Sequence, residues 1–180
     1  MPTAGVRCRA RVVGCSMLML SLAPALADAQ SPAPLRGVNA VTVDASIVAP
    51  EGALPTGLTQ KRLQTLAELK LRSWNLQVAS SEEAEKIPGV TPRVEVDVTM
   101  LETRALQKLA GYAFYTRVAV TQPGTSLRNG AAATTELWSQ GFLTLSEPKQ
   151  VVADVERSAA ELLDQFINEW LAERIKAAQR

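Results

Sequence analysis

The sequence predicts an α+β fold: a two-layer sandwich in which a mixed, mostly antiparallel sheet of about five strands carries two main helices on one face. Two patterns predict it. Several segments alternate apolar and polar residues, as half-buried strands do, and two longer segments carry apolar residues at helical spacing. The elements follow in the order strand, helix, strand, short helix, three antiparallel strands and long helix.

The first strand and the first helix are marked by a change of period. Residues 41 to 48 (VTVDASIV) alternate apolar and polar side chains and predict a half-buried strand. Thr59 is a candidate N-cap for an amphipathic helix that continues to about Arg72. Residues 74 to 78 alternate again, which predicts a short second strand with Trp74 on its buried face.

Three longer strands are expected in the second half of the chain, after a single helical turn. Ser80 and Glu83 have the spacing of a capping box, which predicts that turn. Residues 93 to 104 show the clearest alternation in the chain, residues 112 to 120 alternate with aromatic side chains, and a fifth strand is expected from about 133 to 145.

Turn signals and caps divide the remaining sequence. Gln122-Pro123-Gly124 and Asn129-Gly130 predict a loop whose last dipeptide suits a hairpin. Gly141 is a candidate bulge, because the apolar parity of its strand is mixed. Ser146 is expected to cap a long C-terminal helix from about Glu147 to Ala178.

The N-terminal residues predict export. Residues 1 to 27 contain a basic start, an apolar run and a small-x-small site, so cleavage is expected near Ala27 or Ala29. The apolar run of about fifteen residues is shorter than the roughly 20 that span a bilayer, so no permanent membrane span is expected. The sequence thus predicts a periplasmic or secreted protein with a flexible leader at 28–38 and a single domain at 39–180.

The two cysteines raise the question of lipidation. Residues 12 to 15 (VVGC) resemble the lipobox of bacterial lipoproteins, in which the cysteine is acylated. A lipobox closes the apolar segment, whereas here most of that segment follows Cys15. Lipidation at Cys15 is therefore not expected, and because Cys8 also lies in the signal, the exported chain is expected to have no thiol.

Composition argues against several functions. The chain has no histidine, which excludes a Ser-His-Asp triad and, with no thiol after cleavage, a zinc site of ordinary ligands. The formal net charge is +1, and loss of the three arginines of the signal makes it −2, so nothing favours nucleic acid. We expect no enzymatic activity, no metal and no cofactor.

Two surfaces are candidates for binding a partner. The aromatic strand and the strand before it share a polar face, on which a cross-strand pair between Arg117 and Asp97 or Glu95 is expected. The long helix exceeds the reach of strands of six to eight residues, so either the helix breaks and folds back or its last apolar turns project. The candidate residues are Tyr115, Arg117, Glu95 and Asp97 on the sheet, and Trp170, Leu171 and Ile175 on the helix.

Two other functions stay open from the sequence. The many Leu and Val residues allow a cavity for an apolar ligand such as a lipid between the helices and the sheet. Glu95, Asp97 and Glu102 are clustered on one strand, and the first two lie about 6.6 Å apart along it, a spacing compatible with a carboxylate-pair hydrolase.

The element order over residues 40 to 170 resembles that of small periplasmic α+β domains in bacterial envelope-assembly factors. These include the outer-membrane lipoprotein activators of peptidoglycan synthases, the curli secretion lipoproteins and uncharacterised lipoprotein families. The resemblance rests on element order, without a diagnostic motif. It implies a non-catalytic adaptor or binding protein in envelope assembly or transport, with an envelope protein or a second copy as its partner.

Overall fold

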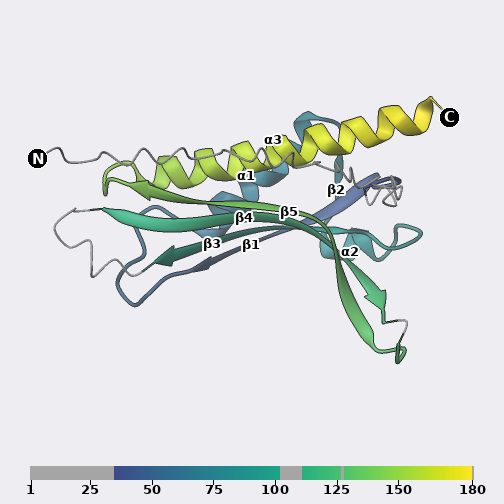
Figure 1. Ribbon diagram of the computed structural model, residues 1–180, viewed down its shortest axis with the longest axis horizontal. Coiled ribbons are helices and arrows are strands. Elements are labelled where there is room, and N and C mark those ends of the chain that lie inside the picture. The colour runs from purple at the N-terminus through teal and green to yellow at the C-terminus, as the bar shows by residue number, and fades with distance from the viewer. Residues whose placement is uncertain (1–34, 102–110, 127, 180) are drawn as a thin grey trace, which may run out of the picture. The chain divides into compact units, whose positions relative to one another are not determined.

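The computed structural model describes residues 35–101, 111–126 and 128–179. Its elements are β1 (Ala40–Val48), α1 (Gln60–Ser73), β2 (Gln77–Val78), α2 (Ser81–Ala84), β3 (Arg93–Leu101), β4 (Tyr112–Thr125), β5 (Ala132–Ser146) and α3 (Val151–Ala178). The sheet has the order β2-β1-β3-β4-β5, and α1 and α3 lie on one face of it (Figure 1). β1 is parallel to β2 and β3, whereas β3, β4 and β5 are antiparallel. The predicted α+β class and element order are confirmed.

Several expectations concern residues outside the described ranges. The signal sequence, its cleavage site and Cys15 all lie in residues 1–34, and Glu102 lies in the segment 102–110. The predicted leader is described only at its end, where Leu35 and Val38 are buried in the core cluster. The packed region therefore begins before residue 39.

Both predicted helix starts in the first half are confirmed. The Thr59 side chain accepts a hydrogen bond from the backbone N–H of Arg62 at 3.2 Å, which satisfies a donor that the first turn of α1 would leave unpaired. At α2, the Ser80 N–H donates to the Glu83 carboxylate at 2.8 Å, and the Glu83 N–H donates to Ser80 Oγ at 3.2 Å. This reciprocal pair is a capping box.

The capping box predicts a pH dependence of α2. The Ser80 backbone N–H bond, and then the Ser80 hydroxyl, lower the pKa of Glu83 below its ordinary value of 4.5. A lowered pKa means that the cap stabilises the turn above pH 4.5 and is lost as pH falls through the folded-state pKa. We expect the Ser80 amide resonance to titrate with a midpoint below 4.5 in an NMR experiment. The same titration in Glu83→Gln should be flat, and a midpoint at or above 4.5 would contradict the cap.

The second strand is shorter than expected, and Trp74 lies outside it. β2 contains Gln77 and Val78 alone. Asn75 has φ 59°, in the left-handed region, so the chain reverses directly after α1. This turn buries Leu76 and leaves Trp74 at the end of the helix with 47% of its surface exposed. The predicted burial of Trp74 is wrong because strand parity does not hold through a left-handed residue.

The core lies between the helices and one face of the sheet. Alternate residues of β3 and β4 face the helices, among them Val96 and Phe114, and both are fully buried. Leu63 of α1 and Phe166 of α3 meet them from the helix layer. Trp138 of β5 packs against Phe166 at a centroid distance of 5.5 Å. The opposite sheet face carries neither α1 nor α3 (Figure 1).

The hairpin between β4 and β5 is longer than the sequence predicts. Residues 122 to 124 pair with β5, where Pro123 lies opposite Thr134, and are not a loop. Pro123 lies beyond Thr121, the last β4 residue paired with β3. In this part of β4 only β5 is a neighbour, and an edge strand of this kind tolerates a residue without an N–H donor. The bulge lies at Val120/Thr121 and not at Gly141. Figure 1 shows the hairpin bending away from the helix layer.

The last helix begins later than expected. Residues 147 to 150 form a turn closed by Gln150 N–H to the Glu147 carbonyl at 2.9 Å, and α3 starts at Val151. The Ser146 hydroxyl does not cap it, because it donates instead to the Asp154 carboxylate. Within the described ranges, no helix has the length and apolar character needed to cross a membrane.

Candidate functional site

The candidate site is the open face, defined as the sheet face opposite α1 and α3. Register places its side chains in rows across four strands, because directly paired residues point to the same side. The open-face residues are Thr42, Asp44, Ser46 and Val48 of β1, Arg93, Glu95, Asp97, Thr99 and Leu101 of β3, Ala113, Tyr115, Arg117, Ala119 and Thr121 of β4, and Glu136, Ser139, Gly141, Leu143 and Leu145 of β5.

One end of the open face is an apolar patch. Its members are the exposed side chains Val48, Leu101, Tyr115, Leu143 and Leu145, which are between 39% and 67% exposed. Tyr115 and Leu143 are direct cross-strand partners, and Leu101 and Leu145 flank Ala113 in the next row. Exposed apolar side chains scattered singly need no explanation, whereas a contiguous group indicates an interaction surface.

Tyr115 is held in place by a glycine on the neighbouring strand. A Cβ at Gly141 would overlap Tyr115 Oη, and it would lie 2.7 Å from Tyr115 Cζ and 2.9 Å from the Thr116 carbonyl oxygen, so the phenol ring occupies the space above Gly141. Gly141 is thus the site where an aromatic ring packs across a strand, which explains a glycine inside regular pairing. The sequence predicts Tyr115 on this face but does not predict its packing over Gly141.

Gly141→Ala is expected to destabilise the sheet by about 1–3 kcal/mol, because the added methyl group meets both a side chain and backbone. Urea denaturation measures the effect. Combining it with Tyr115→Ala should recover part of the loss, since the ring is then absent while the contact with the Thr116 carbonyl remains. Fully additive losses would show that the ring does not occupy this space.

A polar band lies next to the apolar patch and links four strands. Ser46 Oγ donates to Asp97 Oδ1 at 2.7 Å, and Arg117 Nη1 donates to Asp97 Oδ2 at 3.4 Å. Arg117 also pairs with Glu136, whose second carboxylate oxygen accepts from Ser139 Oγ at 2.6 Å. The predicted pair between Arg117 and Asp97 is present. Each exposed ion pair contributes under about 1 kcal/mol, so the band orients side chains more than it stabilises the fold.

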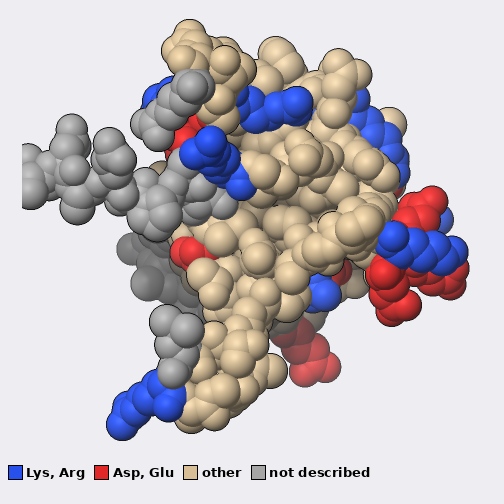
Figure 2. Space-filling view, turned by 90° about the vertical axis from the view of Figure 1, so that its right-hand side faces the viewer, with Lys and Arg blue, Asp and Glu red and all other residues tan. Residues whose placement is uncertain are grey.

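Beyond the polar band lies a cleft of about 690 Å³, lined by residues of the open face and also by Val43 and by Gln64 of α1. The bent hairpin supplies one wall and the segment from α2 to β3 supplies the other. Its charged lining residues are Asp44, Glu85, Arg93 and Glu95. Glu95 accepts a hydrogen bond from Thr121 Oγ1 at 3.0 Å. Figure 2 looks at the end of the domain on the right of Figure 1, where uncharged residues predominate and charged side chains lie mainly round the margins, with a group of both signs on the right.

The carboxylates proposed for hydrolysis are placed in separate contacts. Asp97 belongs to the polar band, and Glu95 lines the cleft with Thr121 as its partner. Both carboxylates therefore have hydrogen-bond donors within the sheet. Among the residues that the structure describes, no group of three Cys, His, Asp or Glu side chains is arranged to hold a metal ion.

The three candidate residues of the long helix have different environments. Trp170 is fully buried, its Nε1–H donates to the Val38 carbonyl at 2.8 Å, and the Arg174 guanidinium lies 4.8 Å from its ring centroid. Leu171 is half-buried, and Ile175 is 58% exposed. Trp170 is thus a core residue and not available to a partner, whereas Ile175 lies on the last, projecting turns of α3.

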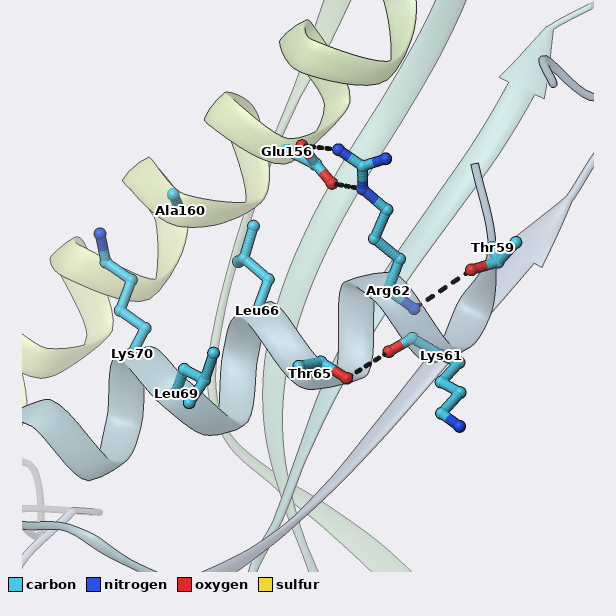
Figure 3. A pocket seen from close by; sticks show the side chains of 9 residues that line it. All are labelled: Thr59, Lys61, Arg62, Thr65, Leu66, Leu69, Lys70, Glu156 and Ala160. Atoms are coloured by element: carbon cyan, nitrogen blue, oxygen red, sulfur yellow. Dashed lines mark hydrogen bonds and ion pairs between the residues drawn. The ribbon is translucent and has the colours of Figure 1, made fainter. Parts of the chain in front are cut away.

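A shallow groove runs between α1 and α3, with a volume of about 830 Å³ (Figure 3). Ion pairs bridge the helices at two levels, Arg62 with Glu156 and Lys70 with Asp164. The Glu156 carboxylate raises the pKa of Arg62 above its ordinary value. Arg62 and Lys70 are eight residues apart on α1, and Glu156 and Asp164 are eight residues apart on α3. The two helices therefore run in the same direction, and the two bridges lie about 12 Å apart along them. Leu66 and Ala160 line the groove between the two bridges. The groove is therefore the ordinary surface depression between two packed helices.

The sequence matches no protein-family model and no curated protein. Solved structures with a similar arrangement include a variant PelC dodecamer from Paraburkholderia phytofirmans, with 13% identity over 69% of this chain and 85% of that chain and a TM-score of 0.41. A minor lipoprotein from Acinetobacter baumannii has 14% identity over 76% and 93%, with a TM-score of 0.37. Rare lipoprotein B from Shewanella oneidensis has 13% identity over 77% and 99%, with a TM-score of 0.34. At these values the likenesses assign neither family nor function.

Proposed function

We propose that this chain is a non-catalytic binding protein of the cell envelope that engages a protein partner through its open face. The observation that carries the proposal is the contiguity of the apolar patch: five exposed apolar side chains from four strands meet on a sheet face that neither α1 nor α3 covers. Keeping such a surface in water is unfavourable, and burying it against a partner is favourable.

The open face suits recognition because two of its side chains are already held in contacts before binding. Tyr115 is seated over Gly141, and Arg117 is held between Asp97 and Glu136. Tyrosine and arginine recur at the centres of protein interfaces, where they contribute most when they are fixed and surrounded by apolar contacts. Binding to a preorganised surface loses less side-chain entropy, so more of the contact energy appears as affinity.

The charge of the cleft indicates which side chains the partner should carry. The cleft lining contains three acidic residues and one arginine, so its formal charge is negative. We infer a partner with an apolar segment that covers the patch and basic side chains that enter the cleft. The envelope location rests on the export signal expected in residues 1–27.

Site-specific photo-crosslinking in cells tests this proposal. A photoreactive residue at position 143 lies in the patch, and one at position 69 on α1 is a matched control, because Leu143 and Leu69 are 61% and 62% exposed. We expect a discrete adduct with one envelope protein from position 143 and none of the same mass from position 69. Identical adduct patterns from both positions, or no adduct from position 143, would overturn the assignment of the open face.

A further inference from the structure

The two edges of the sheet differ in length. β2 forms one edge with two residues, whereas β5 forms the other with fifteen. An edge strand has one row of backbone N–H and C=O groups without a partner in its own sheet, and a long edge is a template for another strand. The β5 edge is therefore the larger pairing surface of the described sheet.

Little in the β5 sequence prevents pairing. Proteins blunt their sheet edges with lysine, proline, inward charges or bulges. Residues 137 to 146 (LWSQGFLTLS) contain no charged residue and no proline. The register shift opposite Val120/Thr121 falls at the start of this segment, so residues 138 to 146 pair regularly with β4. This stretch is long enough for a stable strand pair.

We propose that β5 pairs with β5 of a second copy, antiparallel about a two-fold axis. In such a pair each residue faces a residue of the same segment, so a charged edge would bring like charges together. This segment has none, and Glu136 is the charged residue that precedes it. The edge is therefore compatible with itself, which is the argument for a second copy over an unrelated strand.

This pairing joins two five-stranded sheets into one continuous sheet. Leu143 and Leu145, which are exposed on the open face of β5, then gain cross-strand neighbours from the other copy. The two apolar patches meet along the shared edge and face the same side. The dimer thus presents two copies of the open face, so a partner with two binding segments would bind with higher avidity than one copy allows.

Sedimentation velocity of the purified protein tests the pairing, and the substitutions are chosen so that they leave the apolar patch unaltered. Gln140 and Thr144 lie on β5 with the opposite parity to Leu143, so they point away from the open face. We expect the unsubstituted protein to have the mass of two chains and Gln140→Lys/Thr144→Lys the mass of one, because each copy places lysines at the shared edge. The equally charged control Gln60→Lys/Thr65→Lys, at exposed positions of α1, should stay dimeric.

Disulfide crosslinking locates the contact, since both native cysteines lie at positions 8 and 15 and no cysteine occurs in the described ranges. Single cysteines at positions 139 to 145 should give crosslinked dimers at one or two neighbouring positions, where the two-fold axis brings Cα atoms within about 4.4–6.8 Å. Val48→Cys, on β1, should give none above the unsubstituted protein. A single-chain mass for the unsubstituted protein, a dimer that survives the β5 lysines, or crosslinks from Val48→Cys alone would overturn the pairing.

The β5 lysine variant also separates this inference from the proposed function. If the open face binds its partner but β5 does not pair, that variant and the unsubstituted protein are both single chains and both crosslink from position 143. If β5 pairs but the open face binds nothing, the dimer forms and position 143 gives no partner adduct.

Discussion

Trp170→Ala is expected to lower the free energy of unfolding by about 3–5 kcal/mol. The indole is fully buried, so its removal leaves a cavity beneath the final turns of α3. It also leaves the Val38 carbonyl without its Nε1–H donor, and an unpaired buried acceptor adds to the loss. Chemical denaturation followed by circular dichroism measures the change as a lower midpoint with an unchanged slope.

Two control variants separate the contributions of the indole. Trp170→Phe keeps most of the apolar volume and removes the N–H, so a loss of about 1–3 kcal/mol is expected. Trp74→Ala removes the same side chain from an exposed position and should change stability by no more than about 0.5 kcal/mol. Equal losses for Trp170→Ala and Trp74→Ala would contradict the core position of Trp170. Truncation after Asn168 removes this residue too and should unfold the domain at lower denaturant concentration.

Leu143→Thr/Leu145→Thr is expected to weaken partner binding by about 30- to 1,000-fold. Each leucine contributes exposed apolar surface at the β5 end of the patch, and truncation of central interface residues typically costs about 1–2 kcal/mol or more each. Threonine is β-branched, a shape that strands favour, so the strand itself should persist. Titration of the crosslinked partner, once purified, by calorimetry measures the change.

The matched control for this variant is Leu54→Thr, an exposed leucine in the connection between β1 and α1. It should leave the affinity unchanged within about twofold, because it removes apolar surface away from the open face. Equal affinities for the double variant and the unsubstituted protein would show that the patch is not the binding surface.

Alternation along the chain predicts the sheet well because its strands have one buried face. Val94 and Phe114 follow parity into the core, and Asp97 and Arg117, an odd number of residues further along the same strands, follow it onto the open face. Parity is local, however, and fails at Asn75, whose left-handed backbone turns Trp74 outward. Asparagine adopts this conformation more readily than other non-glycine residues and often follows a helix end, so Asn75 is itself the signal that the reading by parity misses.

The extent of the core could not be predicted, because it depends on segments far apart in sequence. The helical stripe of α3 includes Trp170, but helical spacing does not show which turns a sheet covers. Here Leu35 and Val38, read from sequence as leader, pack into the same core cluster, and Val38 supplies the hydrogen-bond acceptor for the indole. A stripe that was expected to project beyond the sheet is therefore covered through Trp170.

The candidate site was predicted in part. Tyr115, Arg117 and Asp97 lie together on the open face as expected, but the apolar patch around Tyr115 was missed. The sequence signal for this patch is an apolar residue at a position where the alternation of its strand calls for a polar one, as at Val48 and Leu101. Such breaks in the alternation indicate a common patch only when the register of the strands places them side by side, and that register is known only from the three-dimensional pairing.

Hydrogen exchange of the protein, alone and bound to the partner identified by crosslinking, tests the central claim most directly. Binding through the open face predicts slower exchange in the strand segments 97–101, 113–117 and 141–145, with unchanged exchange in the middle turns of α1. Slower exchange confined to α1 and α3, with the three strand segments unchanged, would contradict the open face as the binding surface.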